Sequence, residues 1–154
     1  MAAIVLLIIF IMSSQDFNSS AAVSGRISRK LYNWLSPVFS LIRESPGWLL
    51  FIKVDHATRK LAHFFLYYTL TAFIIIGFRT VTARKLIIFS ASFLLVLILA
   101  CIDEFLQSFI DGRTAAATDV LLDLTGAVAA QLTALLAILV RRVKFSVKSD
   151  LNVE

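Results

Sequence analysis

The chain has 154 residues, of which 59% are hydrophobic and only 16% are charged, and its mean hydropathy is +0.87. Soluble domains have about 25% charged residues, so this composition excludes an ordinary soluble protein and indicates a membrane protein. The net charge of +5 does not indicate a nucleic-acid partner, because the basic residues flank apolar stretches, where Lys and Arg hold helix ends at headgroup level. The single cysteine, Cys101, excludes an intrachain disulfide and a multi-cysteine metal site.

The first apolar stretch is the first of four expected membrane spans, over about residues 2–17. Residues 2–12 alone are shorter than the roughly 20 residues that cross a bilayer. This stretch therefore spans fully only if residues 13–17 continue the helix or the chain starts further upstream. Ala22-Val23-Ser24 offers the small residues of a signal-peptide cleavage site, but the usual basic residues before the apolar stretch are missing. We expect a retained helix, with cleavage as the alternative.

The long connection over residues 16–58 contains an amphipathic helix. Apolar residues recur in it at helical spacing, with basic and polar residues largely opposite, which is typical of a helix lying in the membrane interface. The apolar residues are Ile27, Leu31, Trp34, Leu35 and Val38. We expect Pro37 to end or kink this helix, residues 45–47 to form a turn, and residues 48–52 to dip back toward the membrane. The helix would serve as a surface anchor or as a flap over a site, and both interpretations stay open.

Three further apolar stretches follow, over about residues 60–78, 86–108 and 118–140. The predicted fold is therefore all-α: an integral membrane four-helix bundle with an interfacial amphipathic helix between the first and second spans. No Pro- or Gly-rich linker divides the chain, so we expect one transmembrane domain over residues 1–145 and a polar tail over residues 146–154.

The basic residues leave the orientation of the bundle nearly balanced. Eight lie on the side where the spans carry their polar residues, and seven lie in the loop over residues 79–85 and in the tail. The dense charge of those two short segments favours the cytoplasm for their side, which would put the polar side outside the cytoplasm.

The second span presents a polar face. Lys60, His63, Tyr67 and Thr71 follow a 3-4-4 spacing, which places them on one side of a helix. Such a face could relay protons, bind an anion or recognise a lipid headgroup. The alternative is a histidine that only hydrogen-bonds a neighbouring helix.

Acidic residues end the third span. Asp103, Glu104 and Gln107 put two carboxyls and an amide on one turn. Ionisable groups within an apolar run are costly, by about 2.5–3.5 kcal/mol at the membrane centre and less near its surface. This cost favours a functional role.

The fourth span opens with acids on the same side of the membrane. Asp119 and Asp123 are four residues apart, and Gly126, Ala127 and Ala130 continue around the same face. Small residues let a neighbouring helix approach closely, so we expect this face to lie inside the bundle, with both aspartates pointing toward His63 and Glu104. The turn at Asp111-Gly112-Arg113 would fold the arginine back over the carboxylates.

Together these motifs resemble the VanZ-like membrane proteins, a family named after a teicoplanin-resistance protein. The resemblance covers Ser13-Ser14-Gln15, the run Arg59-Lys60-Leu61-Ala62-His63-Phe64 with Tyr67, Asp103-Glu104 with Gln107, Gly112-Arg113, Asp119, Asp123 and Gly126. One departure is Leu66, where the family often has a glutamate, so any role of that carboxylate is absent here. The resemblance implies a four-helix integral membrane protein of the cell envelope, linked to reduced susceptibility to glycopeptides or lipoglycopeptides. It also adds weight to a polar site outside the cytoplasm.

The first hypothesis for function is binding of the headgroup of an anionic lipid or a lipid-linked envelope precursor. Arg59, Lys60 and Arg113 would contact phosphate. The acidic side chains of the site would hold these three cationic side chains in position. The full ligand-binding set is Ser14, Gln15, Arg59, Lys60, Tyr67, Gln107, Arg113, Asp119 and Asp123. Membrane lipids are thus the expected partners, and the sequence does not indicate an oligomeric state.

The second hypothesis is a membrane enzyme, a hydrolase or transferase acting on a lipid-linked envelope substrate. His63 would act as general acid or base, and Glu104 or Asp103 would orient it. We expect no cofactor and assign no metal site. A metal variant, in which His63 and the acids hold a hard or borderline divalent ion, remains an alternative. So does a pure scaffold, whose polar residues only specify helix pairing.

Overall fold

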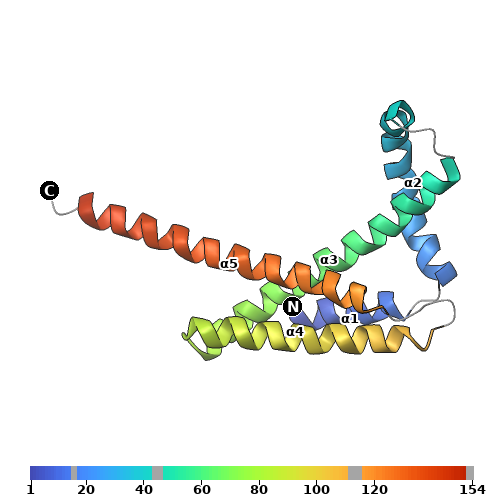
Figure 1. The fold of residues 1–154 in the computed structure, drawn as a ribbon. Helices are drawn as coiled ribbons and strands as arrows, with labels where there is room; N and C mark the ends of the chain where they lie inside the picture. The colour runs from blue at the N-terminus through green and yellow to red at the C-terminus, as the bar shows by residue number, and fades with distance from the viewer. Residues whose placement is uncertain (15–16, 43–46, 111–115, 152–154) are drawn as a thin grey trace.

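The computed structural model describes residues 1–14, 17–42, 47–110 and 116–151, and the side chains of residues 1–14, 25–37, 47–110 and 116–144. Within these ranges the fold is all-helical and contains no strand. Five helices follow one another: α1 (Ala2–Ser13), α2 (Phe17–Ile42), α3 (Gly47–Val81), α4 (Lys85–Gln107) and α5 (Ala117–Leu151). Figure 1 shows α1, α4 and parts of α3 and α5 side by side, with α2 lying beside the first half of α3.

Three of the helices are long and apolar enough to cross a membrane: α3, α4 and the first 28 residues of α5, Ala117–Lys144. At 1.5 Å per residue, the 23 residues of α4 measure about 35 Å, enough for a hydrocarbon core of about 30 Å. The prediction of a helical membrane protein is thus confirmed at this level. In the first stretch, α1 has 12 residues and is about 18 Å long.

Two helices are longer than their sequence patterns predict. The second span was expected over residues 60–78, but α3 already begins at Gly47 and absorbs the segment expected to dip separately. The fourth was expected over residues 118–140, but α5 continues to Leu151, into the predicted tail. Neither helix contains proline, and Lys and Arg are good helix formers, so a change from apolar to polar sequence does not end the helix.

The amphipathic segment forms one helix, α2, which runs through Pro37 to Ile42. Of the two alternatives expected for Pro37, ending the helix is therefore wrong, and a kink stays a prediction. Ile27 and Trp34 are exposed, whereas Leu31 and Leu35 of the same apolar face are half-buried. Ser28, at the edge of this face beside Leu35, is buried against α3. Of the predicted turn at residues 45–47, only Gly47 lies within the described residues.

The centre of the bundle is α3, which contacts each of the other helices. The buried apolar core joins α1, α3, α4 and α5 and consists of Val5, Ile9, Tyr67, Leu70, Val96, Ala100 and Ala127. Helix α1 packs between α3 and α4, and α5 packs on α3 and α4. This arrangement brings the last turns of α1 and α4 beside the first turns of α5.

The small-residue face of α5 lies against α3, as predicted. Gly126, Ala127 and Ala130 are buried. A Cβ atom at Gly126 would clash with the carbonyl oxygen of Phe64 and would lie 3.1 Å from the backbone nitrogen of Tyr68. Glycine is therefore required here by the close approach of two helix backbones.

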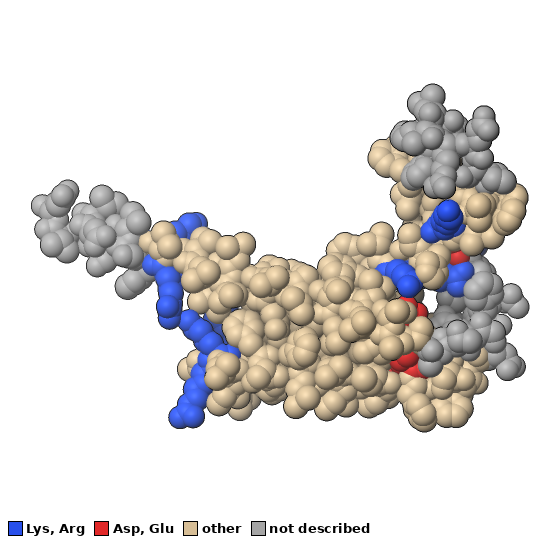
Figure 2. All heavy atoms as spheres, in the orientation of Figure 1, with Lys and Arg blue, Asp and Glu red and all other residues tan. Residues whose placement is uncertain are grey.

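Charged side chains lie at the two ends of the bundle and leave an apolar surface between them (Figure 2). The acids gather at the end where α5 begins. Lys and Arg occur at both ends, including the end where α3 meets α4 (Figures 1 and 2). The orientation in the membrane stays a prediction, because basic charge is present on both sides.

Candidate functional site

Polar residues of four helices meet at the acidic end of the bundle. They are Ser13 of α1, Lys60, His63 and Tyr67 of α3, Asp103, Glu104 and Gln107 of α4, and Asp119 and Asp123 of α5. These residues were singled out from sequence, and the chain brings together residues as distant as Ser13 and Gln107, which are 94 positions apart.

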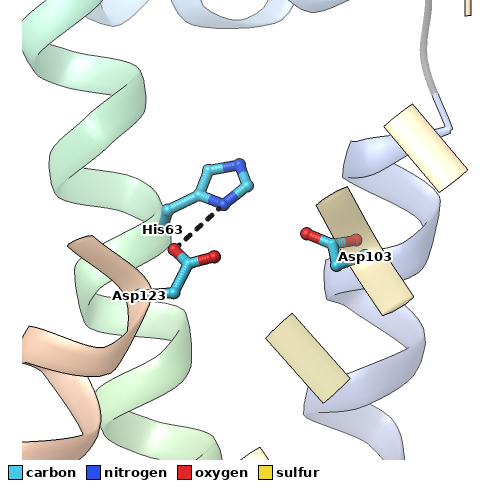
Figure 3. Close-up of side chains that lie close together, drawn as sticks. All are labelled: His63, Asp103 and Asp123. Atoms are coloured by element: carbon cyan, nitrogen blue, oxygen red, sulfur yellow. Dashed lines mark ion pairs between the residues drawn. The ribbon is translucent and has the colours of Figure 1, made fainter. Parts of the chain in front are cut away.

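The centre of the site is formed by His63, Asp103 and Asp123, one residue from each of three helices (Figure 3). The Nδ1 atom of His63 lies 3.5 Å from Oδ1 of Asp123. One ligand-type atom of each residue lies within 4.8 Å of those of the other two. Both aspartates are buried, with 1% and 3% of their surface exposed. Two buried carboxylates and an imidazole that is 24% exposed therefore share a small volume.

Gln107 ties this centre to α1. Its side-chain amide donates hydrogen bonds to Oδ2 of Asp103, at 3.1 Å, and to the hydroxyl of Ser13, at 3.2 Å. The four-residue spacing of Asp103 and Gln107 puts them on the same side of α4. The amide thus holds one oxygen of Asp103, and Figure 3 shows the carboxylate on the side of His63 and Asp123.

Glu104 has a different partner from the one expected. Its carboxylate accepts a hydrogen bond of 2.6 Å from the backbone N–H of Ala116, immediately before α5. It therefore fixes the start of α5, and the carboxylate beside His63 is that of Asp123. Adjacent residues on a helix point about 100° apart, so Asp103 and Glu104 could not both face the same partner.

Lys60 and Asp119 form the rim of the site. The ammonium group lies 3.0 Å from Oδ1 of Asp119, and the two side chains are 36% and 42% exposed. The expectation that Asp119 points inward beside Asp123 is wrong. Asp119 lies one turn nearer the start of α5, at the mouth of the bundle, where its side chain meets Lys60 instead.

Arg59 belongs to a separate cluster that docks α2 on α3. It forms an ion pair with Asp55 of the same helix, and Asp55 accepts a hydrogen bond of 2.8 Å from the buried hydroxyl of Ser28. The sequence analysis missed Asp55 and Ser28, although the four-residue spacing of Asp55 and Arg59 was a usable signal. The Ser28–Asp55 contact thus lies two turns before His63 on α3, and the ring contact of Tyr32 with Phe51 lies further from it. Whether α2 is an anchor or a flap stays open.

The remaining predicted site residues lie at the edge of the site or outside the described residues. Ser14 is exposed, and its hydroxyl donates to the backbone oxygen of Ile11 in its own helix, at 3.0 Å. Gln15 and Arg113, with the predicted turn at Gly112, lie outside the described residues.

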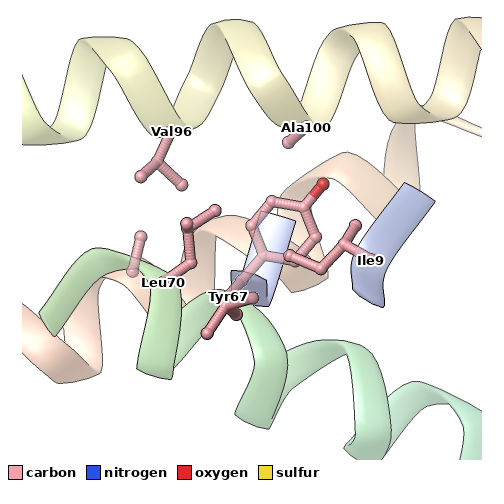
Figure 4. Packing of buried hydrophobic residues seen from close by; sticks show 7 residues of the cluster. Ile9, Tyr67, Leu70, Val96 and Ala100 are labelled. Carbon is pink, nitrogen blue, oxygen red and sulfur yellow. The ribbon is translucent and has the colours of Figure 1, made fainter. Parts of the chain in front are cut away.

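Three buried oxygen atoms in the site have no hydrogen-bond partner within the described part of the chain. They are the hydroxyl of Tyr67, Oδ1 of Asp103 and Oδ1 of Asp123. The hydroxyl of Tyr67 points toward α4 beside Ala100, one turn before Asp103 (Figure 4). A buried polar atom without a partner costs about 1–3 kcal/mol. Oδ1 of Asp123 nevertheless faces Nδ1 of His63 at 3.5 Å, and a cation or proton donor placed among the three atoms would offset this cost.

An apolar groove of about 410 Å³ runs between α1 and α4 at the same end of the bundle. It is lined by Phe10, Ile11, Ser13, Ser14, Leu106 and Ile110. Because Ser13 also binds Gln107, the groove borders the polar site directly.

A family model described as VanZ/LLP1 covers residues 1–140 of the chain. No curated protein matches the chain, and no solved structure does.

Proposed function

The chain belongs to the VanZ/LLP1 family, and we propose on that basis that it is a four-span protein of the cell-envelope membrane that binds a phosphate-bearing headgroup at its polar end. The headgroup belongs to an anionic lipid or to a lipid-linked envelope precursor. In this proposal, residues 1–145 form one transmembrane domain with α1 as its first span. The polar end faces away from the cytoplasm, and binding there lowers susceptibility to glycopeptides or lipoglycopeptides.

One observation carries the binding proposal: a half-exposed ammonium group and an apolar groove flank the same buried polar cluster. Lys60 has three N–H donors and gives one to Asp119. Phosphate oxygens are strong acceptors for such a group. The groove between α1 and α4 is of a size that accepts part of a hydrocarbon chain, whose burial is favourable at about 0.8 kcal/mol for each CH₂ removed from water.

The test compares lipid binding by two lysine variants of the full chain in detergent. Short-chain phosphatidic acid serves as the anionic probe and short-chain phosphatidylcholine as its zwitterionic counterpart. Lys60→Gln should weaken binding of the anionic probe by about tenfold or more, since a hydrogen bond to a charged group contributes about 1.5–3 kcal/mol. Lys85→Gln removes the same charge at the start of α4, at the other end of the bundle, and should leave the affinity unchanged. Equal affinities for both probes, or equal losses in both variants, would contradict headgroup binding.

A second candidate function is a membrane-embedded hydrolase or transferase with His63 as general acid or base. The observation that favours it is the carboxylate of Asp123 facing Nδ1 of His63 at 3.5 Å, because a carboxylate at Nδ1 orients an imidazole for proton transfer through its other nitrogen. Asp123 then replaces Glu104 and Asp103 in the orienting role. Under this function, Asp123→Asn abolishes turnover of a lipid-linked pyrophosphate substrate. Turnover at the wild-type rate in Asp123→Asn would eliminate it.

A further inference from the structure

We propose that His63, Asp103 and Asp123 bind a divalent metal ion between α3, α4 and α5. Each residue offers one ligand atom, and these three atoms lie within 4.8 Å of one another. One imidazole nitrogen with two carboxylate oxygens suits a borderline ion such as Zn²⁺, Mn²⁺ or Fe²⁺. The three ligands come from three different helices, so an ion at this point would join the bundle at its polar end.

The distances suit coordination better than direct hydrogen bonding. A separation of 3.5 Å between Nδ1 of His63 and Oδ1 of Asp123 is long for a hydrogen bond to a charged group, which usually measures about 2.7–2.9 Å. Two ligands bound at about 2.0–2.2 Å with a tetrahedral angle between them lie about 3.4 Å apart. Ligands on opposite sides of an ion lie about 4.2 Å apart. A pair at the 4.8 Å limit of the cluster would close by about 0.6 Å to lie on opposite sides of an ion, or by about 1.4 Å to subtend a tetrahedral angle.

A second observation also indicates a bound cation. Oδ1 of Asp103 and Oδ1 of Asp123 are both buried and accept no hydrogen bond from the described residues. The hydroxyl of Tyr67, whose side chain is fully buried, also has no hydrogen-bond partner among the described residues. A coordinated cation would satisfy both carboxylates.

The surroundings of the ligands also fit a metal site. Gln107 donates to Oδ2 of Asp103 and so fixes the carboxylate on the side of the other two ligands (Figure 3). Such outer hydrogen bonds, which fix the direction of a ligand, are usual around protein-bound metals. The hydroxyl of Ser13 in turn holds Gln107, so the support extends to a fourth helix.

The ion would also resolve an electrostatic conflict in the headgroup proposal, and this step alone rests on the proposed function. The acids of the site outnumber its described cations and would repel a phosphate group. A divalent ion bound by Asp103 and Asp123 offsets their charge and gives the phosphate a second positive contact beside Lys60.

The test is metal binding by the full chain in detergent, with no lipid added. The protein is treated with a chelator, the chelator is removed, and MnCl₂ is added while free Mn²⁺ is measured by electron paramagnetic resonance, with ZnCl₂ as competitor. The wild-type chain should bind one ion. Asp103→Asn and Asp123→Asn should each weaken binding by about tenfold or more, because they remove a ligand charge with little change of shape. His56→Gln removes an exposed imidazole of the same helix as His63, two turns away from it and outside the site, and should bind as the wild type does.

Three results would overturn the metal site. They are no binding of Mn²⁺ or Zn²⁺ by the wild-type chain, unchanged affinity in both asparagine variants, or an equal loss in His56→Gln. If an asparagine variant does not fold, His63→Gln removes the third ligand and provides the same comparison. Lys60→Gln separates the two proposals, since it should retain the ion and lose the headgroup.

Discussion

Replacing Gly126 by alanine tests how closely α3 and α5 approach each other. The new Cβ atom would lie 3.1 Å from the backbone nitrogen of Tyr68 and 3.3 Å from the carbonyl carbon of Phe64, whereas carbon atoms in ordinary contact lie about 3.5–4.0 Å apart. The neighbouring atoms belong to a helix backbone and cannot rotate away. The two helices therefore have to separate by roughly 1 Å at this point, and overpacking of this kind costs about 1–3 kcal/mol.

Gly77→Ala is the matched control, because a Cβ atom at Gly77 meets nothing within 4 Å. Both substitutions gain about 1 kcal/mol of helix propensity, so the difference between the two variants isolates the clash. We expect Gly126→Ala to be less stable than Gly77→Ala by about 1–3 kcal/mol, measured by reversible unfolding in mixed detergent micelles. The same variant should also weaken metal and headgroup binding, because Lys60 and His63 reach their partners across this interface. Equal stability of the two variants would refute the close approach.

Three further predictions concern the polar contacts. Ser28→Ala removes a donor from the buried carboxylate of Asp55, which should lower stability by about 1–3 kcal/mol and increase proteolysis within α2. Gln107→Leu loses two buried hydrogen bonds and should lower the free energy of unfolding by about 1–3 kcal/mol. The half-exposed pair of Lys60 and Asp119 should show a coupling of only about 0.2–1 kcal/mol in a double-mutant cycle.

The Ser28→Ala and Gln107→Leu predictions each have a matched control. Ser36→Ala and Ser108→Ala remove exposed hydroxyls that bond only to the backbone of their own helix, and both should leave stability unchanged. A control that loses as much stability as its partner variant would contradict the corresponding contact. A coupling of several kcal/mol between Lys60 and Asp119 would contradict their position at the rim.

The packing of the helices could be predicted from sequence more fully than the positions where they begin and end. Apolar stretches and the small-residue face of Gly126, Ala127 and Ala130 indicated a helical membrane protein with α5 packed closely on a neighbour. The starts and ends of α3 and α5 could not be predicted from hydropathy, because polar residues continue a helix as readily as apolar ones. Pro37 likewise did not end α2. A proline removes one backbone hydrogen bond from a helix, and the sequence alone does not show whether packing offsets that loss.

The site could be predicted as a set of residues but not as a set of pairs. Periodicity placed His63, Asp103 and Asp123 on inward faces at one end of the bundle. It could not assign Asp123 to His63 or Glu104 to the backbone of Ala116, because pairing depends on the rotation of each helix and on where it ends. Asp119 illustrates the limit: it shares a helix face with Asp123, and only its position one turn nearer the mouth gives it a different partner.

The central claim is that polar residues of α1, α3, α4 and α5 meet at one end of the bundle. Cross-linking of cysteine pairs in native membranes tests it most directly, in a Cys101→Ser background with a short bifunctional thiol reagent. The pair Ser13→Cys with Gln107→Cys should cross-link readily, since the two native side chains are joined by a hydrogen bond of 3.2 Å. The pair Ser13→Cys with Lys85→Cys should not, because Lys85 begins α4 and Gln107, the residue that Ser13 contacts, ends it. Cross-linking of the second pair without the first would contradict the shared polar end.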